Sequence, residues 1–334
     1  MSAVVKSALF LFALPLILTQ WTCDGPRKPT GTTAPEGVSP PQDVPGAAPA
    51  TTPEQRLRAT VDRLTGTPKP RNSQNVEVLD AVARELSQTL SRSGFSCEDQ
   101  PFPVQGKTYR NVVCRGGAPA DKGVWVVGAH YDVYGDLPGA DDNASAVAGL
   151  LELAHRMGPH LTALPYSLEL VAYTLEEPPF FRTANMGSAV HARSLKKRGV
   201  PVLGMVCLEM IGYFSSEKIQ KMPVDALRFL LPKHANFIAA IADIPSAKLA
   251  ERFAAGTNRA GKLQALHLAI PATIEGVDFS DHLNYWNEGF LAFMVTDTAF
   301  FRNPNYHKAT DTADTLDYEK MSAVVDGLIT FLLP

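Results

Sequence analysis

The amino-acid sequence predicts an α/β domain with three layers, in which helices cover both faces of a mixed, mostly parallel central sheet. The apolar runs at 124–128, 168–175, 202–208 and 290–295 are continuous rather than alternating, which is typical of strands buried on both faces. Segments with apolar residues at helical spacing lie between most of these runs. A hydrophobic content of 45% supplies the core that such a domain needs.

The helices are predicted in order along the chain. The first begins after Thr52, because Thr-Pro-Glu-Gln offers an N-cap, a proline at the first helical position and a capping glutamine. The second spans 76–90 and ends before Gly94. We expect residues 215–245 to form connecting loops with a short helix. Further helices are predicted at 144–157, 188–198, 237–242, 246–255 and 318–332.

Residues 95–116 predict a β-hairpin with a two-residue turn at Gln105-Gly106. Counting outward from this turn places Cys97 opposite Cys114. We therefore hypothesise a cross-strand disulfide, which is consistent with an oxidising compartment. A chance alignment of the two cysteines is the alternative.

Residues 1–23 are predicted to be a signal peptide or an N-terminal anchor. A lysine precedes an apolar stretch at 8–18 that has the length of a signal-peptide core and is short for a membrane-spanning helix. Lipidation of Cys23 is an alternative that the residues before it do not favour. The protein is therefore expected to be exported, as a periplasmic, secreted or membrane-tethered protein.

Residues 24–53 contain eight prolines among many glycines, alanines and threonines, a composition that cannot bury a core. This stretch is predicted to be a disordered linker, either a tether or a leader removed with the signal, and 54–334 the folded domain. A net charge of −3 without a basic stripe argues against nucleic acid as a partner. Membrane attachment is expected only through the N-terminal segment.

The candidate chemistry starts from Glu176 and Glu177, two adjacent carboxylates directly after an apolar run. Two unpaired carboxylates in a dry interior are costly, and a bound cation removes that cost. His130 and Glu209 follow or end two other apolar runs. Because ligand sites in α/β sheets form beyond the carboxyl ends of the strands, these residues are expected to converge.

Asp142 and His307 lie on loops after the first and last of these runs. They complete a set of two histidines and three carboxylate positions, in which the Glu176–Glu177 pair counts as one position. This set predicts zinc, in two ions that share a bridging carboxylate. Cys207 is predicted to be a small buried side chain and no ligand. Asp132, two residues after His130, is predicted to orient the imidazole. The sequence thus indicates a metal-dependent hydrolase.

A set of motifs in a fixed order resembles the co-catalytic di-zinc aminopeptidases of metallopeptidase family 28, a family that also includes glutamate carboxypeptidase relatives and glutaminyl cyclases. The resemblance spans residue 75 to the C-terminus, and its specificity lies in the order of the motifs rather than in any one of them. The motifs are GAHYD at 128–132, PGADDNAS at 138–145, EE at 176–177 with GS at 187–188, EMIG at 209–212, SDH at 280–282, and YH at 306–307 with DT at 311–312.

The resemblance implies two zinc ions and assigns their ligands by position. Asp142 would bridge the ions, His130 and Glu209 would complete one site, and Glu177 and His307 the other. Many members have aspartate where this chain has Glu209, so the longer side chain is expected to alter the geometry or affinity of that site. The histidine of the SDH motif is not expected to bind metal.

The resemblance also implies the catalytic roles. Glu176 matches the general base, which takes a proton from a metal-bridging water, and Asp132 matches the acid that holds His130. Asp141 matches a residue that shapes the loop, although the sequence leaves open a swap between Asp141 and Asp142.

The function expected from these residues is that of an exported di-zinc aminopeptidase, which cleaves N-terminal peptide bonds of substrates with a free N-terminus. One alternative is a carboxypeptidase or dipeptidase, with Arg182 as the cation for a substrate carboxylate. A second is a glutaminyl cyclase, which generally works with one zinc. A third is a non-catalytic binding module on the same fold. Phe180 and Phe181 are either pocket lining or ordinary core.

Overall fold

A computed structural model of the chain describes residues 52–221 and 232–333, so the predictions for residues 1–23 and nearly all of 24–53 lie outside the described residues. None of the described helices is both long and apolar enough to cross a membrane. Within the compact unit that begins at Pro49, the helices are α1 (Pro53–Thr65), α2 (Val76–Arg92), α3 (Ala146–Met157), α4 (Gly187–Lys197), α5 (Ala247–Ala260), α6 (His282–Asn287) and α7 (Tyr318–Leu332). The strands are β1 (Ser96–Val104), β2 (Lys107–Gly117), β3 (Val124–His130), β4 (Ser167–Tyr173), β5 (Val202–Glu209), β6 (Ile238–Ala242), β7 (Ala265–Ala269) and β8 (Ala292–Thr296).

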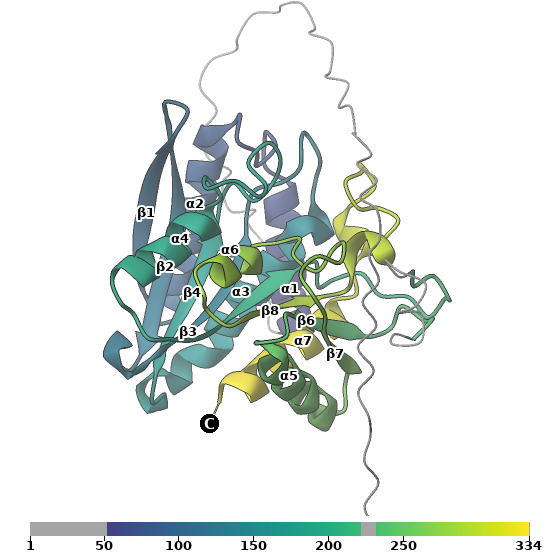
Figure 1. Cartoon of the computed structure of the whole chain (residues 1–334). Coiled ribbons are helices and arrows are strands. Elements are labelled where there is room, and N and C mark those ends of the chain that lie inside the picture. The colour runs from purple at the N-terminus through teal and green to yellow at the C-terminus, as the bar shows by residue number, and fades with distance from the viewer. Residues whose placement is uncertain (1–51, 222–231, 334) are drawn as a thin grey trace, which may run out of the picture. The chain divides into compact units, whose positions relative to one another are not determined.

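The strands form one eight-stranded sheet in the order β1-β2-β4-β3-β5-β8-β6-β7 (Figure 1). The central strands β4, β3, β5 and β8 are parallel to one another. The β1–β2 hairpin joins β4 antiparallel, and β6, which pairs parallel with β7, joins β8 antiparallel. The sheet is therefore mixed and parallel at its centre, as predicted, and the carboxyl ends of four strands meet at one edge.

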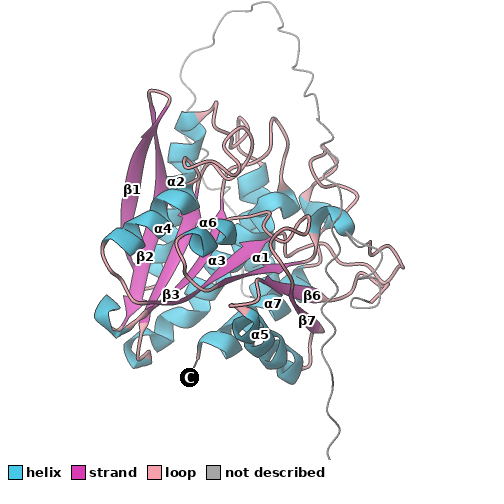
Figure 2. Cartoon of the chain, viewed as in Figure 1, coloured by secondary structure: helices cyan, strands magenta, loops and turns pink. Residues whose placement is uncertain are grey.

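Helices cover both faces of the sheet (Figure 2). One layer contains α1, α3, α5 and α7, which pack on one another, and α4 packs with α6 in the other layer. Side chains alternate between the two cores, because successive residues of a strand point to opposite faces. Val127 and Val206 belong to the first core, and Val126 and Cys207 to the second. The three-layer prediction is confirmed.

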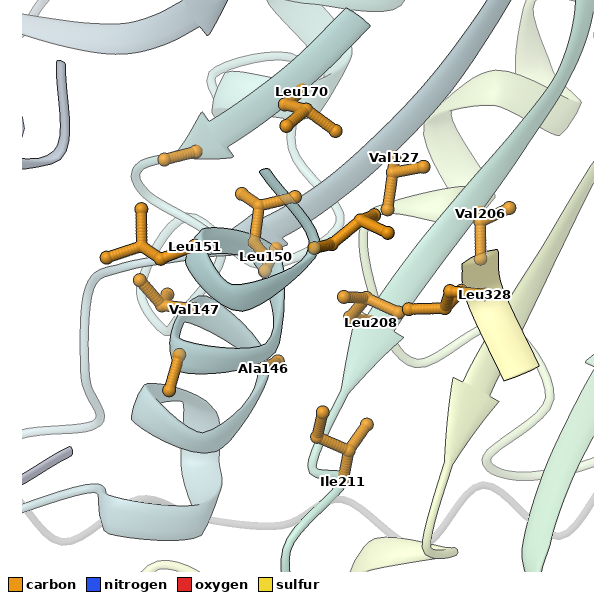
Figure 3. Packing of buried hydrophobic residues seen from close by; sticks show 14 of the residues in the cluster. Val127, Ala146, Val147, Leu150, Leu151, Leu170, Val206, Leu208, Ile211 and Leu328 are labelled. Carbon is orange, nitrogen blue, oxygen red and sulfur yellow. The ribbon is translucent and has the colours of Figure 1, made fainter. Parts of the chain in front are cut away.

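Figure 3 shows the hydrophobic core beneath α3, the helix that follows the polar turn at 140–145. Val147 and Leu150 of α3 and Val127 of β3 are fully buried in one cluster. Burial of each such side chain contributes roughly 1.5–3 kcal/mol. Because α3 begins at Ala146, directly after the turn at 140–145, this packing anchors the turn at the edge of the sheet.

The predicted start of the first helix is confirmed in detail. The Thr52 hydroxyl accepts a hydrogen bond from Gln55 N at 3.3 Å, and the Gln55 side chain accepts one from Thr52 N at 3.2 Å. This reciprocal pair is a capping box. The structure also bears out the helices predicted from 76, 144, 188, 246 and 318, with ends that differ by a few residues.

The helix predicted at 237–242 is wrong, because this segment is strand β6. Its alanines favour a helix, but five residues are too few for a stable one, and every residue of β6 is buried. Pairing with β8 and β7 satisfies the backbone on both sides. Two short elements, β7 and α6, were not predicted, and residues 222–231 of the loop region lie outside the described part.

The predicted hairpin register is confirmed. Cys97 is paired with Cys114 across β1 and β2, and Val104 with Lys107 at the turn. The two cysteine sulfurs form a disulfide, with an S–S distance of 2.06 Å. Cys207 is a free buried thiol, as predicted.

Candidate metal centre

The five predicted metal ligands lie together at the carboxyl edge of the sheet. His130 ends β3, Glu209 ends β5 and Glu177 follows β4, whereas Asp142 lies in the turn before α3 and His307 in the loop after β8. The parallel order of the central strands brings these distant segments to one place. Donor atoms lie within 4.8 Å of one another in the groups His130–Asp142–Glu209, Asp142–Glu177–His307 and His130–Glu176–Glu177.

Asp142 lies between the two histidines. Its Oδ1 is 3.5 Å from His130 Nε2, and its Oδ2 is 3.1 Å from His307 Nε2. Glu209 Oε2 lies 3.3 Å from His130 Nε2, and Glu177 Oε2 lies 3.5 Å from His307 Nε2. Two donor triads therefore share the carboxylate of Asp142, with one oxygen directed to each histidine.

Glu176 lies beside both triads. Its Oε2 is 3.9 Å from His130 Nε2, and the residue is buried. Burial raises the pKa of Glu176 well above its usual range, and the charges of Glu177 and Glu209 add to this effect against the opposing charge of His130. A carboxyl group in this environment has a strong tendency to take up a proton.

The pKa values of other donors in the centre are shifted as well. Burial and the charge of Asp142 raise the pKa of Glu177 to about 8, and burial raises the pKa of Glu209. Burial by itself would lower the pKa of the histidines. Hydrogen bonds to Asp142 and Glu177 nevertheless raise the pKa of His307 to about 9, and the charge of Glu209 raises that of His130. Without a cation, protons must compensate the buried carboxylates.

The donors fit a zinc ion on two counts. His130 Nε2 and Glu177 Oε1 are buried and have no hydrogen-bond partner among the described residues, although buried polar atoms in proteins are nearly always satisfied. Imidazole and carboxylate donors without cysteine are the ligands of catalytic zinc, which keeps a coordination position open beyond three protein ligands.

Asp132 supports the centre through the backbone. Its carboxylate accepts hydrogen bonds from the backbone N–H groups of Glu176 at 3.2 Å and Glu177 at 3.1 Å. His130 Nδ1 lies 3.2 Å from the carbonyl oxygen of Asp132 and 3.6 Å from its Oδ1. The hydrogen-bond contact with the imidazole is thus made by the backbone carbonyl of Asp132, whereas its carboxylate, which was predicted to orient the ring, mainly holds the loop that presents the two glutamates.

The structure separates the roles of the adjacent aspartates. Asp141 is directed away from the triads: its Oδ1 accepts a hydrogen bond from Gly212 N at 2.9 Å, and its Oδ2 one from Asn303 Nδ2 at 2.7 Å. The carboxylate of Asp311 accepts from the N–H groups of Asp141 and Asp142, at 2.9 and 3.1 Å. Asp142 is therefore the member of the pair that faces both histidines.

Ser280 and Asn143 are supporting residues that sequence reasoning did not identify. Ser280 Oγ donates to Glu209 Oε2 at 2.6 Å and also lies 3.1 Å from Cys207 Sγ. Asn143 Nδ2 lies 3.4 Å from the same Glu209 oxygen, and its Oδ1 accepts from Met210 N at 2.9 Å. In the sequence, these two residues stand out only as members of the SDH and PGADDNAS motifs. Membership of a motif does not indicate which groups their side chains contact.

Left-handed backbone conformations occur at or next to three residues of the candidate centre. Leu175 has φ 60° before the glutamate pair, Met210 has φ 48° after Glu209, and His307 itself has φ 53°. Such values are unfavourable for residues other than glycine and concentrate at functional sites.

His282 is not part of the centre, as predicted. Its Nε2 lies 2.7 Å from the carbonyl oxygen of Val277, and burial lowers its pKa to about 4. His191 is a buried core residue, with Nδ1 2.6 Å from Tyr285 OH and Nε2 3.0 Å from Glu169. In the described part of the chain, no histidine other than His130 and His307 lies in a metal-donor group.

An apolar cleft opens beside the donors. It is lined by Glu209 of the centre and by Tyr306, next to His307. Aromatic rings form much of its wall, from Phe279, Phe300 and Phe301. The centre is therefore accessible from a pocket that is suited to an apolar group.

The three-layer fold and the histidine and carboxylate donors at the edge of its sheet are those expected of a metal-dependent hydrolase. The profile of peptidase family M28 matches residues 111–332, about two thirds of the chain. The chain belongs to this family of metallopeptidases.

Curated proteins are also similar in sequence to this chain. The chain is similar to YfbL, an uncharacterized protein of Escherichia coli K12, with 44% identity over 84% of this chain and 87% of the relative. It is also similar to LpqL, a probable lipoprotein aminopeptidase of Mycobacterium tuberculosis, with 25% identity over 69% of this chain and 46% of the relative. The chain thus spans less than half of LpqL and of two fungal relatives described as probable zinc metalloproteases.

Solved structures share the fold. A zinc aminopeptidase of Bacillus subtilis matches with a TM-score of 0.66 and 12% identity, over 83% of this chain and 94% of that one. A glutaminyl cyclase of Bacteroides thetaiotaomicron matches with a TM-score of 0.62 and 16% identity, over 84% of this chain and 97% of that one. Likeness at these identities shows the fold alone and does not separate the two activities.

Proposed function

We propose that this chain is an exported aminopeptidase that binds two zinc ions and hydrolyses N-terminal peptide bonds. The observation that carries the proposal is the carboxylate of Asp142, whose two oxygens face the histidines of two separate donor triads. His130 and Glu209 would complete one zinc site, and Glu177 and His307 the other. Bound zinc supplies Lewis acidity and lowers the pKa of water.

Glu176 is the proposed general base. It is the carboxylate of the cluster that belongs to neither of the two donor triads, and it lies within reach of both proposed zinc sites. Its raised pKa suits a group that accepts a proton from the attacking water and then donates it to the leaving amine. The oxygen of the water bonds to the carbonyl carbon, the C–N bond breaks, and the amine leaves with the proton that Glu176 transfers to it.

Charge favours a substrate with a free N-terminus over one with a free C-terminus. Four carboxylates converge in the centre, and among the described residues no lysine or arginine pairs with them. Arg182, the candidate cation for a substrate carboxylate, instead forms an ion pair with Asp278 and lies over the ring of Phe279 at 5.0 Å. The candidate cation for a substrate carboxylate is therefore already paired, which favours a substrate that is recognised at a free N-terminus.

The apolar cleft supports a large apolar side chain at the N-terminal residue. Burial of a leucine- or phenylalanine-sized side chain there is favourable by roughly 1.5–3 kcal/mol. Phe181 reaches the neighbourhood of this cleft, with its ring 5.6 Å from that of Phe279, whereas Phe180 is buried in the core.

Export and domain organisation are part of the proposal. Residues 1–23 would direct export or anchor the protein, 24–53 would link, and 54–334 would form the peptidase domain. The Cys97–Cys114 disulfide supports an oxidising compartment. Cell fractionation and the mass of the mature N-terminus would test this, and a cytoplasmic protein with an intact first residue would contradict it.

The test of the activity combines metal content with a substrate panel. We expect about two zinc ions per chain and hydrolysis of aminoacyl substrates, with no cleavage of N-acetylated or C-terminal glutamyl analogues. Glu176→Gln should retain both ions and lose turnover by several orders of magnitude. One ion with cyclisation of N-terminal glutamine would indicate a cyclase, and no ion with no turnover would leave a binding module.

A pair of glycine variants tests the cleft. A Cβ at Gly276 would lie 2.9 Å from Phe301 and 3.5 Å from Phe300, so Gly276→Ala should narrow the pocket and shift preference toward smaller N-terminal residues. Gly199 also has a positive φ, but nothing lies within 4 Å of its Cβ position. Gly199→Ala is the matched control for backbone strain, and an equal change in preference in both variants would contradict the assignment.

A further inference from the structure

The two candidate histidine ligands are oriented by different means. A histidine that binds a metal through one ring nitrogen is usually oriented by a hydrogen bond at the other. His130 has such a contact, with Nδ1 3.2 Å from the carbonyl oxygen of Asp132. The ring of His307 approaches carboxylates through Nε2, and no described residue forms a hydrogen bond with its Nδ1.

Two tyrosine rings stack on the imidazole of His307. The ring of Tyr306 is stacked on His307 with a centroid distance of 3.8 Å and an interplanar angle of 16°. The ring of Tyr134 is stacked with a distance of 4.0 Å and an angle of 3°. Both rings are nearly parallel to the imidazole and would overlap on one face, so they must lie on opposite faces. His307 is sandwiched between them.

We propose that Tyr134 and Tyr306 are positioning residues that orient His307 by stacking, so that its Nε2 faces Asp142 and Glu177. The inference rests on the proposed metal role of His307. A ring held on both faces keeps little rotational freedom about χ2, which is the freedom that a hydrogen bond at Nδ1 would otherwise remove.

Tyr134 is the informative member of the pair, because it is distant in sequence and 38% exposed. Its loop is held without its ring: Val133 N donates to the carbonyl oxygen of Arg71 at 3.0 Å, and Asn72 Nδ2 donates to that of Gly135 at 2.6 Å. Removal of the tyrosine ring should therefore leave the loop folded. The contact with His307 then explains why a tyrosine ring occupies this partly exposed position.

The first test is zinc affinity, measured by competition with a chromophoric chelator on the full chain. Tyr134→Ala should weaken binding about tenfold, whereas Tyr134→Phe, which keeps the ring, should stay within about twofold of the wild type. Leu203→Ala is the matched control and should have no effect, because Leu203 is similarly exposed (40%) and lies near the start of β5, at the end of the strand opposite Glu209. The cobalt-loaded Tyr134→Ala protein should also show a changed visible spectrum.

A double-mutant cycle tests whether Tyr134 acts through His307. In a His307→Ala background, Tyr134→Ala should not change the affinity of the zinc that still binds. Three results would overturn the proposal: wild-type affinity in Tyr134→Ala, equal losses in Tyr134→Phe and Tyr134→Ala, or an undiminished loss in the His307→Ala background.

Ring-current shifts make the inference independent of the proposed activity. In metal-free protein, the carbon-bound imidazole protons of His307 should resonate upfield of random-coil positions, and Tyr134→Ala should move them downfield. Absence of metal binding in the wild type would refute the proposed function while the shifts still report on the stacking. Unshifted resonances in the wild type would refute the stacking itself.

Discussion

Replacement of Ser280 by alanine is expected to weaken zinc binding without unfolding the protein. The Ser280 hydroxyl donates to Glu209 Oε2 at 2.6 Å, and both residues are buried. The other groups described near that oxygen are more distant: Asn143 Nδ2 lies at 3.4 Å and His130 Nε2 at 3.3 Å. Glu209 would therefore lose its main orienting contact.

The size of the effect follows from the chemistry of this contact. A hydrogen bond to a charged group contributes roughly 1.5–3 kcal/mol. If that contribution favours the metal-binding state of Glu209, Ser280→Ala should weaken zinc affinity by roughly one to two orders of magnitude. Burial already raises the pKa of Glu209 and the Ser280 hydrogen bond lowers it, so the variant should also bind zinc with a stronger dependence on pH.

The assay is chelator competition at several pH values, together with thermal unfolding. Ser246→Ala is the matched control, because Ser246 is a buried serine at the other end of the sheet whose Oγ accepts from Ala292 N at 3.1 Å. Both variants should lose a similar, small amount of stability, and only Ser280→Ala should lose affinity. Zinc affinity within twofold of the wild type in a folded Ser280→Ala protein would refute the reasoning.

Three further outcomes follow from buried groups. Because the pKa of Glu177 is raised to about 8 and that of His307 to about 9 without metal, zinc uptake at pH 7 should release at least one proton, and affinity should rise with pH. Calorimetry in buffers of different ionisation enthalpy would show no proton release if this is wrong. Glu169 is buried, which would raise its pKa, but His191 and Arg115 lower the pKa to about 2. The stabilising effect of the ionised Glu169 is therefore present above about pH 4.5 and is lost as the pH falls toward 2. Over that window, roughly 3 kcal/mol of the difference in unfolding free energy between wild type and Glu169→Gln should disappear, and a pH-independent difference would contradict this. Gly128→Ala should lower unfolding stability by at least about 1–3 kcal/mol in a denaturant titration, because its Cβ would lie 2.2 Å from the ring of Tyr173, and wild-type stability would show that the ring can move.

Local sequence was sufficient where the decisive interactions are local. The capping box at Thr52 and Gln55 involves residues three apart, so the helix start could be predicted from four letters. The hairpin register that pairs Cys97 with Cys114 follows from a two-residue turn. The buried central strands are evident from continuous apolar runs, because only a sheet covered on both faces buries them.

Local sequence failed where pairing decides the structure. The residues of β6 form a strand because β8 and β7 lie on either side of them, and the helical preference of their alanines does not outweigh that pairing. The short elements β7 and α6 carry too few residues for a periodic signal. Their assignment required the sheet edge and the core into which they pack.

The sequence by itself determined the class of protein and the five residues that converge on the candidate metal centre, because ligand-type side chains follow strands whose parallel order brings their ends together. Only the tertiary structure decided which aspartate faces both histidines, that Ser280 supports Glu209, and that two tyrosines enclose His307. Those relations join residues up to 173 positions apart, as between Tyr134 and His307, and depend on side-chain directions set by packing. No local pattern in the chain encodes such directions.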